Sequence, residues 1–433
     1  MTGKEINSCK KCVVCTGCGR GAEKKEGLQA ISDFSFFSRE KEDDDSKKRY
    51  ASLRETEENA LLVATDIGTT TIVMQLRSMG TGEVFDTFRC VNPQRKYGAD
   101  VLSRIQAAEE MPGAAETMQE EVLAVLEQGL EQFGRTDESL MPGKKDGNSR
   151  IHGMVIAANT TMVHLLMGYP VDTLGKAPFT SEYLKEIRTT IAGVDTVIMP
   201  GISAFVGGDI VAGLYAYRTQ ASEATKENFL FLDLGTNGEI VLGNQERMLA
   251  TATAAGPAFE GRLDANVWGA DGVRFLAKLL EKGFVDETGL LAEEYFEEGI
   301  SIGSTIMTRD DIRSLQLAKA AVYAGISVLC KKMEEDRIDR VYLAGGFGYF
   351  LNPRDAVKIG LIPRELEEKC IAVGNAALEG AFCYGRERFC RNIEMAEQAM
   401  EKAEELIGKT EICNLANTPE FEKIFIESIN LVS

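Results

Sequence analysis

The 433-residue chain is poor in histidine and has no long apolar run, and each absence excludes a class of function. Its two histidines are His152 and His164, so chemistry that depends on several imidazoles is not expected. No stretch approaches the ~18 uncharged apolar residues of a membrane-spanning helix. Because the first residues carry no apolar core either, we expect no signal peptide and a cytoplasmic protein.

Basic residues are also scarce relative to acidic ones. The chain has 48 lysines and arginines against 67 aspartates and glutamates, which gives a formal net charge of −19. Binding to phosphate-rich polymers depends on cationic patches, so neither nucleic acid nor an anionic membrane is expected as a main partner. The remaining composition is typical of a globular protein, and the length predicts two or more domains.

Cysteine, in contrast, is abundant, and four of the ten cysteines are crowded together. They are Cys9, Cys12, Cys15 and Cys18. In a reducing compartment this cluster indicates a metal site rather than disulfides. Closely spaced cysteines suit a chain wrapped around a [4Fe–4S] cluster, whereas zinc sites usually pair two Cys-x₂-Cys units that lie farther apart. The spacing alone leaves iron–sulfur and zinc both open.

Apolar strand patterns begin only after a charged stretch. Residues 23–59 are rich in lysine, glutamate, aspartate and serine, which predicts a solvated, flexible linker behind the cysteine segment at 1–22. Strand and helix spacing then predicts a first lobe over 60–222 and a second lobe over 223–433. The last part of the second lobe, residues 391–433, is acidic and has helical spacing, so we expect a helical tail.

A short apolar strand that runs into an Asp-x-Gly-Thr turn occurs twice. The first unit begins at residues 61–64 and continues into a strand at 72–76, so a hairpin is predicted. The second unit begins at 228–232 and continues into a strand at 240–242. Two such units in one chain indicate an internal duplication. Turns that face each other across a cleft could hold the β- and γ-phosphates of a nucleotide from opposite sides.

Each turn has the residue types that a phosphate site needs. Glycine lets backbone N–H groups approach phosphate oxygens, and hydroxyls add donors. An aspartate would repel phosphate, so Asp66 and Asp233 are expected to hold Mg²⁺ through water. The expected phosphate contacts are Gly68, Thr69 and Thr70 in the first turn and Gly235, Thr236, Asn237 and Gly238 in the second. Either turn alone could be a purely structural hairpin.

Two further carboxylates could orient the water that attacks the terminal phosphate. Glu239 directly follows the second turn, and Asp209 follows two glycines at the start of an expected helix. Phosphoryl transfer depends mostly on positioning and charge neutralisation, so a carboxylate at this place would help. The alternative roles are a surface strand residue for Glu239 and a helix N-cap for Asp209.

A glycine-rich stretch follows the strand predicted at 340–343. Its glycines, Gly345, Gly346 and Gly348, would let the chain lie flat against an adenosine, where a Cβ atom would collide. Taken alone, the stretch could be an ordinary strand-to-helix turn. In this order, the two turns and the glycine-rich stretch resemble the motif set of the actin-like ATPases. That resemblance implies an α/β, actin-like ATPase fold with two duplicated ribonuclease H-like lobes around a nucleotide cleft.

Further segments extend the resemblance from about residue 61 to the C-terminus. They are Asn-Pro-Gln at 92–94, Tyr-Gly-Ala-Asp-Val-Leu-Ser-Arg-Ile at 97–105, Thr-Ala-Ala-Gly-Pro-Ala-Phe-Glu-Gly at 253–261, Gln-Leu-Ala-Lys-Ala-Ala at 316–321 and Ile-Gly-Leu-Ile-Pro at 359–363. Together they make the chain similar to the ATP-dependent reductive activators of corrinoid proteins. The resemblance implies a Mg²⁺-dependent ATPase that reduces the cob(II) form of a corrinoid protein of a methyltransferase system to cob(I).

The resemblance also implies the cofactor and the partners. An iron–sulfur cluster, here of the [4Fe–4S] type, would pass on an electron from a separate electron donor, and the ATPase cores would form a homodimer. Two features depart from the family pattern. Many members carry a plant-type [2Fe–2S] domain where this chain has a much shorter cysteine segment, and they have a longer insert after the segment that ends at Gly261. Because the insert is shorter, the family's mode of partner docking and part of its nucleotide pocket are not implied for this chain.

Two functions of other classes remain open at this stage. A small-molecule kinase of the actin-like superfamily would need a substrate pocket with a catalytic aspartate, but it would have no use for four clustered cysteines. An ATP-dependent regulatory module would carry a structural zinc at the same cysteines.

Overall fold

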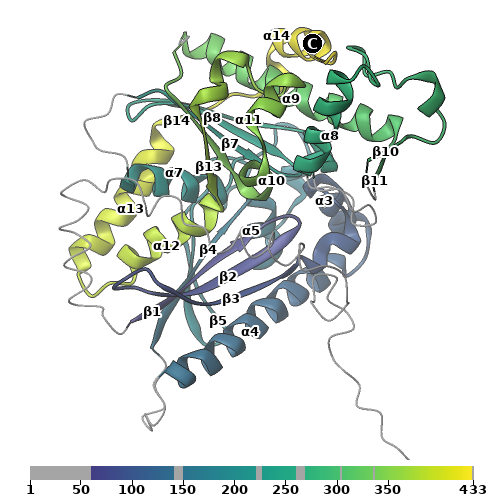
Figure 1. Cartoon of the computed structure of the whole chain (residues 1–433). Coiled ribbons are helices and arrows are strands. Elements are labelled where there is room, and N and C mark those ends of the chain that lie inside the picture. Colours follow the sequence, from purple (N-terminus) through teal and green to yellow (C-terminus); the bar gives the residue numbers. More distant parts are fainter. Residues whose placement is uncertain are drawn as a thin grey trace, which may run out of the picture.

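The computed structural model describes residues 60–140, 150–220, 227–259, 269–302, 305–334 and 337–431. The predicted cysteine cluster, the predicted linker and the segment after Phe259 that departs from the family pattern lie outside these described residues. The described part contains two six-stranded sheets and a small two-stranded one, with helices around and between the large sheets (Figure 1).

The first large sheet has the strand order β3-β2-β1-β4-β6-β5. Strands β1, β2 and β3 form an antiparallel meander, β4 pairs parallel to β1, β6 pairs parallel to β4, and β5 pairs antiparallel to β6. The strands are β1 (Leu61–Ile67), β2 (Thr71–Ser78), β3 (Val84–Val91), β4 (Ile151–Ala158), β5 (Ile187–Ile191) and β6 (Val194–Ile198). The hairpin predicted around the first turn is therefore confirmed.

The second large sheet repeats the core of the first. Its order is β13-β12-β7-β8-β9-β14. The meander β7-β8-β9 is antiparallel and the pairs β7–β12 and β12–β13 are parallel, as in β1-β2-β3, β1–β4 and β4–β6. The strands are β7 (Phe229–Leu234), β8 (Gly238–Gly243), β9 (Met248–Thr253), β12 (Arg340–Ala344), β13 (Cys370–Gly374) and β14 (Thr410–Ile412). This repetition confirms the internal duplication and the actin-like, two-lobed fold expected from the sequence.

The purely helical tail predicted for residues 391–433 is partly wrong. Helices α13 (Ile393–Gly408) and α14 (Pro419–Glu427) are present, but β14 lies between them and pairs parallel to the edge strand β9. A three-residue strand leaves no readable period in the sequence, and here it forms because β9 offers an unpaired edge.

Helices cover the outer face of each large sheet. On the first sheet, Met118, Val122 and Phe133 of α4 pack with Leu61 and Val63 of β1. The four-residue spacing of the apolar side chains makes α4 amphipathic and fixes the face that it buries. On the second sheet, residues of α8 and α9 pack in the same way against β7 and β8. The outer helices are α3 (Val101–Glu110), α4 (Ala114–Leu140), α5 (Thr160–Met167), α8 (Gly269–Glu281) and α9 (Arg309–Met333).

Two helices lie between the sheets and join the lobes. Helices α7 (Gly208–Gln220) and α12 (Ala376–Arg388) share one core cluster with residues from both sheets, such as Leu62 and Phe231. They pack so closely that a Cβ atom on Gly380 would lie 1.8 Å from the carbonyl oxygen of Ala212. In Figure 1 they lie on the left, between β1 and β2 below and the second sheet above. The shared core means that the lobes are in contact through these helices.

The shorter elements mostly connect these layers. Among the described residues, no helix is long and apolar enough to cross a membrane. The shorter elements are η4 (Pro93–Tyr97), α6 (Asp172–Gly175), η5 (Gly256–Phe259), η6 (Glu293–Tyr295), β10 (Ile300–Ile302), β11 (Thr305–Met307), α10 (Gly345–Phe350), α11 (Pro353–Lys358), η7 (Arg364–Lys369) and η8 (Leu415–Asn417).

Candidate functional site

The two Asp-x-Gly-Thr turns occupy equivalent places in the two sheets. Asp66 is the last but one residue of β1, and Asp233 is the last but one residue of β7. Each of these strands is the first of its meander and pairs on its other side with a parallel strand, β1 with β4 and β7 with β12, so each aspartate lies where the chain enters the hairpin turn. Glu239 pairs directly with Asp233 across the β7–β8 hairpin, which places the two carboxylates on neighbouring strands.

Four carboxylates predicted from the sequence come together at this place. Burial, against a hydrogen bond from Asn375 that lowers it and with a smaller contribution from the charge of Asp209, raises the pKa of Asp66 to about 7. Burial likewise raises the pKa of Asp233 to about 7, with contributions from Asp209 and Asp66. The pKa of Glu239 lies well above its usual range because the side chain is buried and faces Asp209 and Asp233. Mutual repulsion of this kind requires that the four groups lie close together.

The alternative roles considered for Glu239 and Asp209 can now be judged. Glu239 is only 8% exposed, so it is not a surface strand residue. Asp209 lies one residue after the start of α7, where its Oδ1 accepts a hydrogen bond from the backbone N–H of Ile210 at 2.9 Å. Burial raises the pKa of Asp209 to about 6. Asp209 therefore stabilises the first turn of α7, and its negative charge also acts on the other three carboxylates of the site.

This set of carboxylates fits a hydrated divalent cation. Crowded carboxylates with raised pKa values carry negative charge that a cation would neutralise. Within the described ranges, no three histidine, cysteine or acidic side chains are arranged to ligate one ion together. An ion held here would therefore take its other ligands from water or phosphate, which is how Mg²⁺ usually binds.

The glycine-rich stretch of the second lobe borders the same carboxylates. Gly345 has a φ of +75°, and a Cβ atom at this position would lie 2.6 Å from Oδ1 of Asp233. A side chain there would therefore displace the aspartate. Gly348, in contrast, is buried, and its Cβ atom would lie 2.9 Å from the carbonyl carbon of Leu343. Gly345 thus shapes the site, and Gly348 lets α10 pack on β12.

Of the other predicted glycines, two close the turns through their N–H groups and one permits close packing. In the second turn, the N–H of Gly235 donates to the carbonyl of Asn237 at 2.8 Å, which closes the turn. Gly238 is buried, and a Cβ atom on it would lie 2.7 Å from Oγ1 of Thr253. In the first turn the N–H of Gly68 donates to the carbonyl of Thr71 at 2.9 Å. The remaining predicted residues of the two turns and of the glycine-rich stretch are Thr69, Thr70, Thr236 and Gly346, which lie beside these glycines.

One residue of the site was not predicted from the sequence. Nδ2 of Asn375 donates a hydrogen bond of 2.7 Å to Oδ2 of Asp66, while its Oδ1 caps α12 by accepting from the N–H of Leu378. The signal in the sequence was an asparagine directly before an apolar helix, which predicts a cap. Nothing local indicated that the other end of the same amide would reach a carboxylate 309 residues away.

The two histidines and the scattered cysteines lie outside this site. His164 is buried and bonded to the carbonyl of Pro170 and to the Ser181 hydroxyl, which agrees with a core position. The described cysteines are six free thiols. Burial raises the pKa values of Cys370 and Cys383 to about 12, so both behave as inert thiols.

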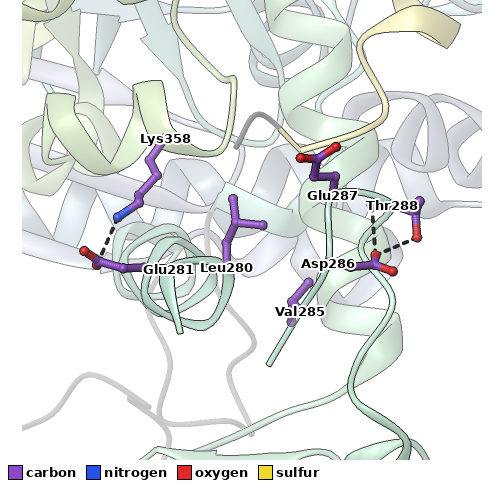
Figure 2. A pocket seen from close by; sticks show the side chains of 7 residues that line it. All are labelled: Leu280, Glu281, Val285, Asp286, Glu287, Thr288 and Lys358. Carbon is purple, nitrogen blue, oxygen red and sulfur yellow. Dashed lines mark hydrogen bonds and ion pairs between the residues drawn. The ribbon is translucent and has the colours of Figure 1, made fainter. Parts of the chain in front are cut away.

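A depression of about 550 Å³ on the second lobe contains none of the predicted site residues (Figure 2). It is lined by Leu280, Glu281, Val285, Asp286, Glu287, Thr288 and Lys358. Its one lysine, Lys358, is paired with Glu281 at 2.9 Å, and the other charged groups that line it are acidic. Such a lining does not suit a phosphate ligand, so the carboxylate site between the lobes remains the candidate.

Comparison with known proteins agrees with this geometry. The family model described as the RACo middle region matches residues 61–222, and the model of the C-terminal domain of RACo, the ASKHA domain, matches residues 227–264 and 265–433. The corrinoid activation enzyme RamQ of Eubacterium limosum is 28% identical over 393 residues, which cover 74% of this chain and 63% of RamQ.

A solved structure is similar as well. It is described as a reductive activator for a corrinoid, iron–sulfur protein, and it matches with a TM-score of 0.72 and 28% identity. The match covers 86% of this chain and 66% of that chain. This chain therefore spans about two thirds or less of the length of each of these two proteins.

Proposed function

Because the chain belongs to the RACo family, we propose that it is an ATP-dependent reductive activator, which reduces the inactive cob(II) form of a corrinoid protein to cob(I). The observation that carries the proposal is the meeting of Asp66, Asp209, Asp233 and Glu239 between two duplicated turns. The names of RamQ and of the similar solved structure support a corrinoid protein as the partner. The reduction adds one electron to cobalt.

The nucleotide part of the proposal assigns a role to each group. The turns after β1 and β7 hold the phosphates through backbone N–H groups and hydroxyls, and the N-terminus of α10 contacts the adenosine. Asp66 and Asp233 anchor Mg²⁺ through water, and the ion, when bound, neutralises phosphate charge. Glu239 orients the attacking water, and Asp209 supports it.

The electron part of the proposal rests on the N-terminal cysteines. Cys9, Cys12, Cys15 and Cys18 would hold a [4Fe–4S] cluster, because four thiolates are the usual ligand set of such a centre. When bound, the cluster would accept an electron from a separate donor and pass it on. A linker of ~37 flexible residues has a root-mean-square reach of roughly 30–35 Å, which would let one cluster visit both donor and acceptor.

ATP would act at a different place, the contact between the lobes. The Asn375–Asp66 hydrogen bond joins the start of α12 to the first turn, so a nucleotide bound at this turn would bias how the lobes meet. A nucleotide can stabilise only the lobe arrangement to which it binds more tightly. The free energy that it supplies for electron transfer is therefore limited to the difference in its affinity for the two arrangements.

We further propose a homodimer of ATPase cores in the cytoplasm. Light scattering that shows only monomer at tens of micromolar would contradict the dimer.

The test uses the full-length chain under anaerobic conditions. The reduced protein is mixed with a corrinoid protein of a methyltransferase system and ATP, and the visible spectrum follows cob(II). A Cys12→Ser/Cys15→Ser double variant should hydrolyse ATP as the wild type does but fail to reduce cobalt. If the variant reduces cobalt as fast as the wild type, the cysteines do not carry the electron, and a structural zinc would replace the cluster. Metal analysis of the same samples distinguishes iron from zinc.

A further inference from the structure

The first turn is held from behind by a group of buried polar residues. All three carbonyl oxygens of residues 68–70 accept a hydrogen bond from the buried side. Gly68 O accepts from Nδ2 of Asn92 at 2.8 Å, and Thr70 O accepts from the backbone N–H of Asn92 at 2.9 Å. Thr69 O accepts a hydrogen bond from Nη2 of Arg104. The carbonyl edge of the turn is therefore fixed against the protein interior.

The donors are themselves rigidly placed. Arg104 is fully buried, and its guanidinium also donates to the carbonyl of Gly98 at 3.1 Å and contacts Oε1 of Gln94 at 3.5 Å. Asn92 is fully buried as well, and its Oδ1 accepts from the backbone N–H of Gln94 at 2.9 Å, which caps η4. We call Asn92 and Arg104 the inner support. Both belong to the 92–105 stretch, to which the proposed function assigns no role.

The side-chain oxygen of the turn is oriented from the same direction. Oγ1 of Thr69 accepts from Nδ2 of Asn159 at 3.2 Å, and Oδ1 of Asn159 accepts from the N–H of Met162 at the start of α5. Because this bond uses the oxygen as an acceptor, the hydroxyl proton of Thr69 is left to point elsewhere.

The direction of the carbonyls determines the direction of the N–H groups. In a trans peptide the C=O and the N–H point to opposite sides. Since the carbonyls of Gly68 and Thr69 point toward Asn92 and Arg104, the N–H groups of Thr69 and Thr70 point to the opposite side of the turn. Hydrogen bonds from a guanidinium also polarise the peptide, which strengthens the N–H on its other side as a donor.

We propose that Arg104 and Asn92 are positioning residues that preset the first turn for the phosphate groups of the nucleotide. The inference rests on the proposed nucleotide site and adds to it the source of its phosphate selectivity. The inner support contacts the backbone of one turn, so it acts on the triphosphate and not on the adenosine. Arginine suits this role because two nitrogens of its fork, Nε and Nη2, bond Gly98 and Thr69, whereas a lysine presents its donors from one atom and lacks this fork.

The test compares two ligands on full-length protein. Isothermal titration calorimetry measures the dissociation constants of Mg-ATP and of adenosine for the wild type, Arg104→Lys and Asn92→Ser. Serine caps as asparagine does, so Asn92→Ser removes the Nδ2 donor while it keeps the cap of η4. Both variants should bind Mg-ATP about tenfold more weakly, the effect of losing about one hydrogen bond, and adenosine within about twofold of the wild type.

A matched control is a buried arginine of the same lobe that does not contact the turn. Arg77 is 4% exposed and bonds Glu379 and the carbonyl of Gly82. Arg77→Met should lower the melting temperature but leave the ratio of the ATP and adenosine constants unchanged.

The outcomes separate the inference from the proposed function. Equal weakening of ATP and adenosine in the folded variants, or no weakening of either, would overturn the inference while the nucleotide site stands. If the wild type binds neither ligand, the nucleotide site itself is wrong. If one variant does not fold, the other decides.

Discussion

At the scale of single residues, the carboxylates between the lobes are arranged for binding and not for stability. Asp66 and Asp233 carry charges that burial and their neighbours oppose, as their raised pKa values show. A protein gains nothing from such groups unless a cation neutralises them. Their positions at equivalent ends of β1 and β7 give the two turns the same chemistry. One ligand that is bound from both sides requires such equivalent groups.

The first prediction concerns these two aspartates. Asp66→Ala or Asp233→Ala should abolish ATP hydrolysis, because each removes an anchor for Mg²⁺. Neither change removes core area, so the melting temperature should stay the same or rise. Steady-state phosphate release and thermal unfolding measure the two effects. Unchanged turnover in both variants would show that the site is elsewhere.

Lys319 of α9 is a second residue whose charged form is disfavoured by burial. It is 1% exposed, its Nζ donates to the carbonyl of Asn430 at 2.6 Å, and burial lowers its pKa to about 8. Between about pH 8 and pH 10.5 the unfolded chain, with its ordinary lysine pKa, binds more protons than the folded one. The free energy of unfolding therefore gains a contribution that grows as the pH rises through this window.

Lys319→Met should remove that contribution. Relative to the variant, the wild type should gain up to about 3 kcal/mol in the free energy of unfolding between pH 8 and pH 10.5, from urea titrations at each pH. Lys331→Met, which changes an exposed lysine of the same helix, controls for the loss of a charge. A wild-type-minus-variant difference that does not change with pH would show that Lys319 is not desolvated.

At the scale of secondary-structure elements, α12 is the part that ties the lobes together. It follows β13 of the second sheet after Gly374, which has a φ of +67°, yet its side chains bond the first lobe. Glu379 pairs with Arg77 at 2.7 Å, and Arg388 pairs with Glu186 at 2.7 Å. The chain therefore passes from one lobe to the other at Gly374 and Asn375, directly beside Asp66.

We call the connection at Gly374 and Asn375 the joint, and Asn375→Asp tests whether it affects the nucleotide site. Aspartate caps a helix as well as asparagine, so α12 should begin where it does now. The substitution replaces a hydrogen-bond donor to Asp66 with a like charge, so ATP hydrolysis should fall at least about tenfold. Asn392→Asp changes the N-cap of α13 in the same way and should leave turnover unchanged. Equal turnover of the two variants would contradict a role for the joint.

Much of this could be predicted from the sequence, because the signals were local. The hairpins around Asp66 and Asp233 follow from apolar spacing and turn residues, and their repetition indicated the fold class. The contacts that depend on distant residues could not be predicted. Asn375 reaches Asp66 and Arg104 supports Thr69 only because the fold brings them together. The strand β14 was missed for the same reason, since it exists by pairing with β9.

At the scale of the whole molecule, the architecture separates the two tasks that the proposed function combines. The duplicated lobes share one core through α7 and α12, so a change at the carboxylates between them can alter how they meet. The cysteines that would carry the electron belong to the N-terminal segment, far from this core in the sequence. The proposed function therefore requires that ATP and the electron act at different places and meet only on the partner protein.

The most direct test of this claim is the rate of cob(I) formation with and without ATP. Wild-type protein, reduced anaerobically, is mixed with a corrinoid protein in the cob(II) state, and the visible spectrum of the corrinoid is recorded. Cob(I) should form rapidly only when Mg-ATP is present. Asp233→Ala, with its iron content and reducibility intact, should give no cob(I) under either condition. Equal rates of cob(I) formation with and without ATP, or full activity of Asp233→Ala, would show that ATP does not drive the reduction.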